Sequence, residues 1–307
     1  MEFSHKPVLL KETVEILQIN PEGIYVDGTA GGAGHSAEIA KRLTTGKLIA
    51  LDVDPDAVQT AREKLKGLPA AVLQCNFRDI GKALDELGVD KVDGVLFDIG
   101  VSSWQLDNTE RGFSYHGDAY LDMRMSKQGV TAADLVNNLS VEKLTEIFRE
   151  YGEERYAFQI ARAIDKVRRN EKIETTKRLA EIVGSAMPAA ARRDGHPARK
   201  VFQALRIAVN GELDNLSVGI ENAFSRLKAG GVLAVITFHS LEDRIVKQKF
   251  AEFCKGCICP SDFPVCICNR TPTGKLVNKK PIQPSRQEIM ENMRSRSAKL
   301  RAVMKIV

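Results

Sequence analysis

A single stretch predicts the fold of this chain, namely Ile24-Tyr25-Val26-Asp27-Gly28-Thr29-Ala30-Gly31-Gly32-Ala33-Gly34-His35-Ser36. Apolar residues lead to an acid, glycines follow at once, and a helix-compatible segment comes next. This order is typical of a strand, a glycine-rich turn and a helix N-terminus, the place where α/β proteins bind nucleotide-like ligands. Glycine is needed in such a turn because a side chain would keep the backbone away from the ligand.

The glycine turn is compatible with two classes of ligand. Its pattern from Gly32 to Ala37 fits a dinucleotide fingerprint with Ala in third place, and Asp52 and Asp54 follow about twenty residues later. An acid at the end of the second strand can bind the ribose of either NAD or S-adenosylmethionine. Asp27 distinguishes the two, because a carboxylate would repel a pyrophosphate and attract the ammonium of a methionine moiety. We therefore expect S-adenosylmethionine, and an NAD-dependent oxidoreductase is the alternative.

Strands and helices alternate beyond the turn. Short apolar runs separated by helical stretches indicate a parallel sheet with helices on both faces, and thus an α/β fold. The patterns between 131 and 187 are helical only, and one long helix at 201–227 leads back to a last strand. The predicted strands after the first are 47–54, 71–77, 92–98 and 232–238.

The simplest interpretation of this order is an inserted domain. Residues 1–106 and 200–307 form the ligand-binding sheet domain, and residues 107–199 form a helical domain inserted between the fourth and fifth strands.

Composition indicates a globular protein. The chain has 307 residues, of which 43% are hydrophobic and 28% charged, which is ordinary for soluble domains. Residues 1–11 have no apolar run of signal-peptide type, and no stretch approaches the roughly 20 apolar residues of a membrane span. We therefore expect a cytoplasmic protein without a membrane partner.

Basic residues are unevenly distributed although the net charge is only +5. They gather in the helical insertion and in the tail from Arg270 onward, and such regions suit phosphate backbones. Solvated helix faces are the alternative interpretation. The candidates for RNA binding are Arg162, Lys166, Arg168, Arg169, Arg192, Arg193, Arg199 and Lys200.

Eight blocks, in order along the chain, resemble one family. They are Asp27-Gly-Thr-Ala-Gly-Gly-Ala-Gly-His-Ser36, Asp98-Ile-Gly-Val-Ser-Ser103, Arg111-Gly-Phe-Ser114, Leu121-Asp-Met-Arg-Met125, Tyr151-Gly-Glu-Glu-Arg155, Phe202-Gln-Ala-Leu-Arg206, Phe238-His-Ser-Leu-Glu-Asp-Arg244 and Arg294-Ser-Arg-Ser-Ala-Lys-Leu300. The chain is similar to the RsmH (MraW) family of bacterial methyltransferases, which act on N4 of one cytidine in 16S ribosomal RNA. It departs from that pattern at Tyr120 and Met293, where the family usually has proline.

The resemblance implies a class I, Rossmann-like methyltransferase sheet with a helical insertion and S-adenosylmethionine as the cofactor. It also implies 16S ribosomal RNA or the small ribosomal subunit as the partner. The sequence leaves open whether the chain forms a homodimer. By position, the family's cofactor contacts fall on Ala33, Gly34, His35, Asp52, Phe77, Asp98 and Gln105, and the residue reasoning above adds Asp27.

The loop after the fourth strand carries the candidates for catalysis, Asp98, Ser102 and Ser103. An exocyclic cytosine amine is a poor nucleophile, so acceptors that hold its protons and orient its lone pair assist transfer. Asp98 can serve the methionine end, the amine or both. For His35, capping of the following helix is the alternative to a cofactor contact.

Cysteines form the one group that the resemblance does not explain, and their crowding favours thiols or metal over disulfides in a cytosolic protein. A tetrahedral zinc site is one interpretation, and a cysteine-containing surface excursion is the other. The residues are Cys254, Cys257, Cys259, Cys266 and Cys268.

Three function classes remain at this point. An RNA cytosine methyltransferase is the leading one. The others are an NAD-dependent oxidoreductase and a non-catalytic RNA-binding or ribosome-assembly protein that retains a methyltransferase fold.

Overall fold

The computed structural model describes residues 7–189, 195–257, 259, 265, 267–268 and 270–307. It consists of two compact units, one formed by residues 1–100 and 213–307 and the other by residues 101–212. Within the described ranges, every helix is too short or too polar to span a lipid bilayer.

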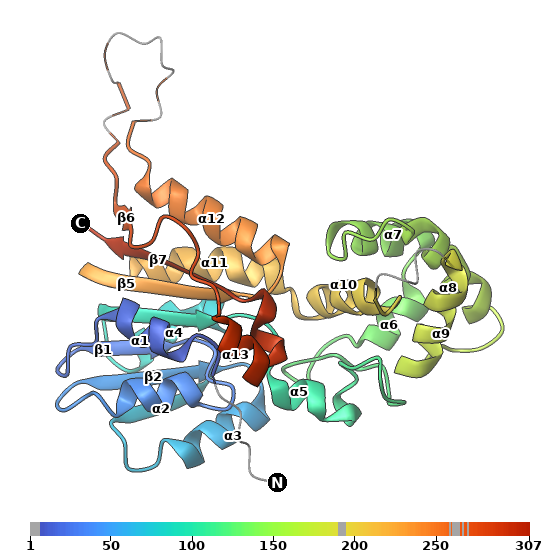
Figure 1. The fold of residues 1–307 in the computed structure, drawn as a ribbon, viewed down its shortest axis with the longest axis horizontal. Coiled ribbons are helices and arrows are strands. Elements are labelled where there is room, and N and C mark those ends of the chain that lie inside the picture. The colour runs from blue at the N-terminus through green and yellow to red at the C-terminus, as the bar shows by residue number, and fades with distance from the viewer. Residues whose placement is uncertain (1–6, 190–194, 258, 260–264, 266, 269) are drawn as a thin grey trace. The chain divides into compact units, whose positions relative to one another are not determined.

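The first unit is built on seven strands. They are β1 (Ile24–Asp27), β2 (Lys47–Asp52), β3 (Ala70–Gln74), β4 (Val92–Asp98), β5 (Leu227–Thr237), β6 (Gly274–Leu276) and β7 (Lys299–Lys305). The strand order is β3-β2-β1-β4-β5-β7-β6, with β1 to β5 parallel and β7 antiparallel to both of its neighbours (Figure 1). The order reverses between β1 and β4, and ligands of open α/β sheets bind at such a switch point.

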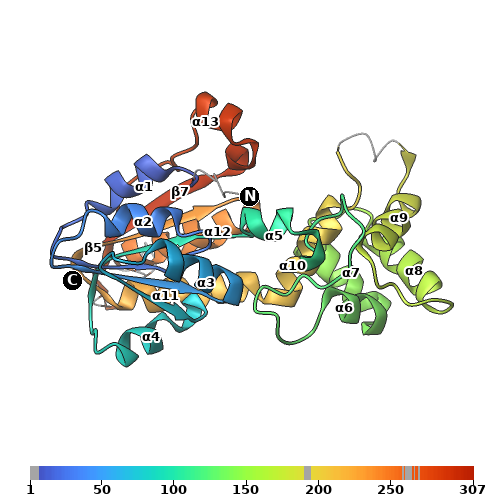
Figure 2. The same cartoon turned by 90° about the horizontal axis from the view of Figure 1, so that it is seen from below.

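Helices cover both faces of the sheet (Figure 2). One face packs against α1 (Leu10–Leu17), α2 (Gly34–Ala40) and α3 (Pro55–Lys64). The other packs against α4 (Ile80–Glu86), α11 (Glu212–Ser225) and α12 (Ser240–Cys254). Side chains alternate between the faces, as pleating requires: in β1, Tyr25 belongs to the first core and Val26 to the second. A further helix, α13 (Arg286–Glu291), precedes β7.

The α/β class and the parallel strands were predicted correctly, and the sheet agrees with the class I methyltransferase fold expected from the resemblance. The last two strands were not predicted. The C-terminal region was interpreted as a basic tail, because Lys299 and Arg301 hide the alternation of the buried Leu300 and Ala302. Both cations pair with Asp243, at 3.1 and 2.7 Å, so they hold β7 against α12.

The second unit is helical and has its own hydrophobic core. Its helices are α5 (Ser103–Asp107), α6 (Ala132–Asn138), α7 (Val141–Glu150), α8 (Ala157–Arg168), α9 (Thr176–Ala186) and α10 (Arg199–Asn210). The unit is wider than the insertion expected at 107–199. The reason is that α5 and α10 pack into the same core, through Leu106 and through Val201 and Phe202.

The single long helix expected at 201–227 is wrong. The chain forms two helices there, because Gly211 adopts the left-handed conformation with φ of 59° and ends α10. Glycine adopts this conformation without the strain that a Cβ atom causes, which makes it the common residue after a helix C-terminus.

Candidate functional site

The glycine turn between β1 and α2 uses its glycines for different purposes. Gly31 has φ of 48°, a conformation that other residues rarely adopt. At Gly28 a Cβ atom would lie 2.4 Å from the Phe97 ring, so this glycine is required by packing. At Gly32 a Cβ atom would meet nothing within 4 Å. Gly32 is therefore a point where the backbone borders open space and a ligand can approach.

The next three residues begin α2. Ala33 is buried and left-handed at the N-cap, with φ of 54°, and its side chain makes no capping hydrogen bond. A Cβ atom at Gly34 would lie 2.2 Å from Pro7, so Gly34 lets the N-terminal segment pack closely. Both residues shape the turn through the backbone.

His35 is buried, and its Nε2 lies 3.0 Å from the carbonyl oxygen of Val8. Because a carbonyl only accepts, Nε2 carries the proton and Nδ1 is the bare nitrogen of the neutral ring. Burial lowers the pKa of His35, which keeps the ring neutral. Nδ1 lies 3.6 Å from Oδ2 of Asp98. The alternative role of His35 as the cap of α2 is wrong, since its ring bonds to Val8 instead.

Asp27 ends β1 and is 1% exposed. Its Oδ2 accepts a 2.6 Å hydrogen bond from the Ser36 hydroxyl, and its Oδ1 accepts one of 3.1 Å from the backbone N–H of Thr29. Desolvation raises the pKa of this carboxyl. Asp27 thus fastens the two ends of the glycine turn and adds negative potential behind it.

Two acids at the C-terminal end of β2 have separate roles. Asp52 accepts hydrogen bonds from the backbone N–H of Gly31 and of Asp54, both at 2.8 Å, so its carboxylate lies against the glycine turn. Desolvation raises the pKa of Asp52 to about 6. Asp54 is fully buried and caps α3 by accepting from Asp56 N–H at 3.0 Å. Asp52 is therefore the ligand candidate, and Asp54 is structural.

Asp98 ends β4, beside β1. Its N–H donates to the Thr29 hydroxyl at 2.6 Å. Although the side chain is 25% exposed, its Oδ1 is buried and has no hydrogen-bond partner among the described residues. Desolvation, together with the carboxylates of Asp27 and Glu242, raises the pKa of Asp98 to about 8. Because an unpaired buried acceptor is costly, Oδ1 is a strong candidate to receive a donor or a cation.

We expect Asp52 and Asp98 to reduce the stability of the ligand-free protein as the pH rises from about 4 to about 8, against the opposite contribution of His35 at about pH 6. The raised pKa values of Asp52 and Asp98 mean that the folded state retains protons that the unfolded state has already lost. Asp98→Asn should flatten the upper part of this profile and have a higher Tm than wild type near about pH 9. Thermal unfolding across this range checks the expectation, and an unchanged difference in Tm at all pH values would contradict it.

Phe77 follows β3 and has a packing role. Its ring lies 4.9 Å from the ring of Phe97, centroid to centroid. Cβ atoms built at Gly28 and Gly219 would lie 3.0 and 2.5 Å from it. Phe77 therefore packs against the α11 side of the sheet, and only the partly exposed remainder of its side chain is available for an adenine.

Ser102, Ser103 and Gln105 lie in the helical unit, at the start of α5. Ser102 Oγ accepts from the Gln105 N–H at 3.2 Å, and Gln105 Oε1 accepts from the Ser102 N–H at 3.0 Å. This reciprocal pair is a capping box. It gives both side chains a local function that the sequence pattern did not reveal.

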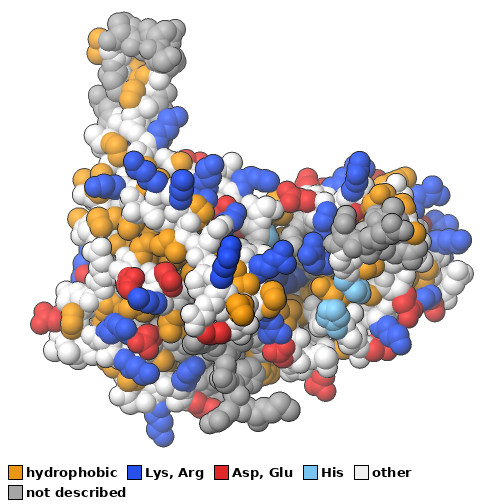
Figure 3. Space-filling view, viewed as in Figure 1, with side chains coloured by type: hydrophobic (Ala, Val, Ile, Leu, Met, Phe, Trp, Pro, Cys, Tyr) orange, Lys and Arg blue, Asp and Glu red, His pale blue; other side chains and the backbone are white. Residues whose placement is uncertain are grey.

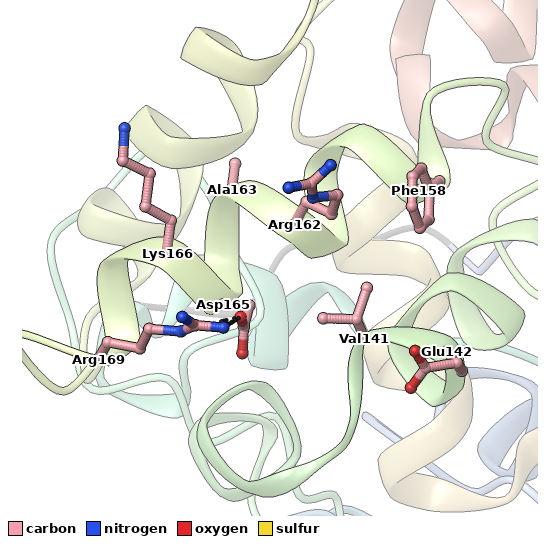
Figure 4. Close-up of a pocket in the computed structure, with 8 residues that line it drawn as sticks. All are labelled: Val141, Glu142, Phe158, Arg162, Ala163, Asp165, Lys166 and Arg169. Carbon is pink, nitrogen blue, oxygen red and sulfur yellow. Dashed lines mark hydrogen bonds and ion pairs between the residues drawn. The ribbon is translucent and has the colours of Figure 1, made fainter.

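Basic residues of the helical unit gather around a pocket of about 550 Å³ between α7 and α8. Figure 4 shows the side chains that line it, with Arg169 bound to Asp165. Arg162 and Lys166 are exposed and take part in no ion pair within the described ranges. The lining residues are Val141, Glu142, Phe158, Arg162, Ala163, Asp165, Lys166 and Arg169.

The other basic candidates differ from Arg162 and Lys166 in their contacts or in their exposure. Arg168 donates to the carbonyls of Val136 and Leu139, at 2.8 and 2.6 Å, and to Asp165, so it closes the end of α6 rather than facing a partner. Lys200 donates to a backbone carbonyl at 3.0 Å, and Arg199 is exposed at the start of α10. Arg192 and Arg193 lie outside the described residues.

An aromatic cluster in the same unit was not predicted from the sequence. The rings of Tyr115 and His196 stack at 4.3 Å, and His116 lies 4.5 Å from Tyr115, centroid to centroid. Both histidines are exposed, and histidine and basic side chains are visible on the face of this unit in Figure 3. Tyr115 and His196 lie far apart in the sequence, so neither spacing nor composition could have indicated the cluster.

The sequence is similar to one protein family over nearly its whole length. The model of the MraW methylase family matches residues 2–306. Three relatives are each named ribosomal RNA small subunit methyltransferase H. The one from Symbiobacterium thermophilum is 53% identical and covers 100% of this chain and 98% of the relative. Those from Carboxydothermus hydrogenoformans and Lachnospira eligens are 52% and 51% identical, each over 100% of this chain and 99% of the relative. This chain belongs to the MraW methylase family.

Proposed function

We propose that this protein transfers a methyl group from S-adenosylmethionine to the N4 amine of a cytidine in bacterial 16S ribosomal RNA. The observation that carries the proposal is the pair of acids at the sheet's switch point, Asp52 against the glycine turn and Asp98 with a buried Oδ1 that has no partner among the described residues. Full-length membership in the methylase family supports it. A ribosomal RNA substrate in a bacterium places the protein in the cytoplasm.

The charge of this edge favours S-adenosylmethionine over a dinucleotide. Asp27 contributes to the raised pKa values of both Asp52 and Asp98, at the edge where ligands of such sheets bind. A pyrophosphate there would meet carboxylates, whereas a sulfonium and an ammonium would neutralise them. An oxidoreductase is therefore disfavoured. A non-catalytic scaffold is disfavoured too, since it would gain nothing from the buried Oδ1 of Asp98.

S-adenosylmethionine supplies a methyl group on a positive sulfur. Its transfer would break the S–CH₃ bond, leave the neutral thioether S-adenosylhomocysteine and form an N–CH₃ bond at N4, after which one amine proton would pass to solvent. Asp98 is placed to accept a hydrogen bond from the amine, which directs the nitrogen lone pair toward the methyl carbon. Asp52 holds the ribose through charge-assisted hydrogen bonds. The backbone at Gly32 leaves room for the ligand.

The helical unit is the part we assign to RNA. Arg162 and Lys166 offer exposed cations to phosphates, and the stacked rings of Tyr115 and His196 offer a surface for an unpaired base. Arg199 and Arg169 extend the basic surface, whereas Arg168 is excluded by its hydrogen bonds to α6.

Incubation with radiolabelled S-adenosylmethionine tests the function. We expect label in N4-methylcytidine after nucleoside analysis, with free 16S RNA and isolated small subunits compared as substrates. Label in another nucleoside would overturn the assigned position. No label with either substrate, from a protein that binds S-adenosylmethionine, would favour the scaffold.

Asp52→Asn should weaken S-adenosylmethionine binding by about 1.5–3 kcal/mol, the range for hydrogen bonds to a charged group. The amide keeps the size of the side chain but loses its charge. Asp54→Asn is the matched control and should bind nearly like wild type, because the Asp54 side chain is buried and caps α3. Calorimetry gives both dissociation constants, and equal affinities would remove Asp52 from the site.

A further inference from the structure

A segment whose described apolar side chains are exposed joins α12 to β6. Helix α12 ends at Cys254, and the next strand, β6, begins at Gly274 (Figure 1). Its ends are fastened by the N–H of Thr273, which donates to the Phe253 carbonyl at 2.9 Å. Farther out, Val265 and Ile267 are each 70% exposed. Burial of these two side chains therefore does not hold the segment in its fold.

Three cysteines of the segment converge instead. The sulfurs of Cys257, Cys259 and Cys268 all lie within 4.8 Å of one another. The sulfurs of Cys257 and Cys268 are 3.7 Å apart. Two thiolates bound to one tetrahedral zinc with Zn–S bonds of about 2.3 Å would be about 3.8 Å apart. The Cys257–Cys268 separation is thus that of neighbouring ligands around a single ion, and Cys259 lies close enough to be a third ligand.

A disulfide or a hard metal ion fits the cluster less well than zinc does. A disulfide would use two of the sulfurs and leave the third beside them without a role. Thiolates select zinc over magnesium or calcium, which prefer oxygen ligands. In a small segment whose described apolar side chains are exposed, a structural metal commonly supplies the missing stability.

We propose that Cys257, Cys259 and Cys268 bind one Zn²⁺, which holds the segment between α12 and β6 in its folded form. Three thiolates leave the fourth tetrahedral position to a ligand outside this set. Cys254 is not assigned to it, because its sulfur does not belong to the group of sulfurs that lie within 4.8 Å of one another. Cys266 lies outside the described residues and forms no part of the proposal. The site shares no residue with the switch point.

Metal analysis of the full chain purified under reducing conditions tests the proposal. We expect one zinc per chain in wild type and almost none in Cys257→Ser, Cys259→Ser or Cys268→Ser. Cys75→Ser is the matched control, since Cys75 lies next to β3, and it should retain its zinc. Cobalt substitution should give thiolate charge-transfer bands in wild type that the three variants lose.

A second measurement uses wild type alone, so it does not depend on whether the cysteine variants fold. Chelation of wild type should speed proteolytic cleavage between residues 255 and 273 while leaving S-adenosylmethionine binding intact, and added zinc should reverse the effect. The proposal would be overturned if wild type contained no zinc and its cleavage rate stayed the same after addition of chelator or of zinc. Zinc that persists when all three cysteines are replaced would also overturn it, as would the chromophore of an iron–sulfur cluster.

Discussion

Asp98→Asn is expected to lower the turnover number about 10²–10³-fold at saturating S-adenosylmethionine and RNA, the loss that follows removal of one preorganised electrostatic contact. The amide keeps the shape of the side chain and still accepts a hydrogen bond, but it no longer places a negative charge beside the reacting amine. Single-turnover methyl transfer measures the effect apart from product release. Asp54→Asn, which alters a buried acid that caps α3, should turn over like wild type.

The pH dependence of S-adenosylmethionine binding tests independently whether the charge of Asp98 acts in the site. With a pKa of about 8, Asp98 is mostly protonated at neutral pH in the ligand-free protein. A cationic ligand prefers the ionised form, so affinity should rise with pH up to about 8, and binding near pH 7 should release a proton. Calorimetry in buffers of different ionisation enthalpy detects the release, which Asp98→Asn should abolish. If the variant turned over at a rate close to that of wild type, Asp98 would have no role in catalysis.

The second large effect concerns RNA. The double variant Arg162→Glu and Lys166→Glu should weaken RNA binding strongly and leave S-adenosylmethionine affinity unchanged. Neither side chain is held by an ion pair within the described ranges, so both are available to phosphates. Each lost phosphate contact lowers the salt slope of binding by about 0.7–0.9. Affinities measured over a salt series give both quantities.

Lys172→Glu with Lys177→Glu is the matched control for that experiment. It makes the same change in charge at two other exposed positions of the helical unit. If both double variants lose the same affinity, the effect comes from the overall charge of the unit and not from the pocket between α7 and α8. If neither loses affinity, RNA binds elsewhere.

Local signals in the sequence predicted the parallel strands and the helical character of residues 131–187. Thr131 and Ser140 precede two of these helical patterns and cap α6 and α7. Asp52 and Asp54 both matched the second-strand acid, and only the structure separates the ligand candidate from the cap. Sequence order does not say which of two neighbouring carboxylates turns toward the glycine turn.

Features that depend on distant contacts could not be predicted. Arg168 looked like one more cation of a basic stripe, yet its function is set by carbonyls about thirty residues earlier. The burial of Asp98 Oδ1 and the stacking of Tyr115 on His196 likewise exist only once the chain is folded. Strand β7 could not be predicted because its lysine and arginine side chains give it the composition of a basic tail. Only the folded chain shows that Lys299 and Arg301 pair with Asp243.

The position of β7 has a consequence for how the chain is made. This strand is the last regular element of the sequence, yet it lies inside the sheet, between β5 and β6. A nascent chain therefore cannot complete its sheet until β7 has left the ribosome. The helical unit, which is continuous in sequence, can fold while synthesis is still under way. The first unit thus completes its sheet only after β7 has emerged, and until then β5 has an open edge that exposes the chain to mispairing.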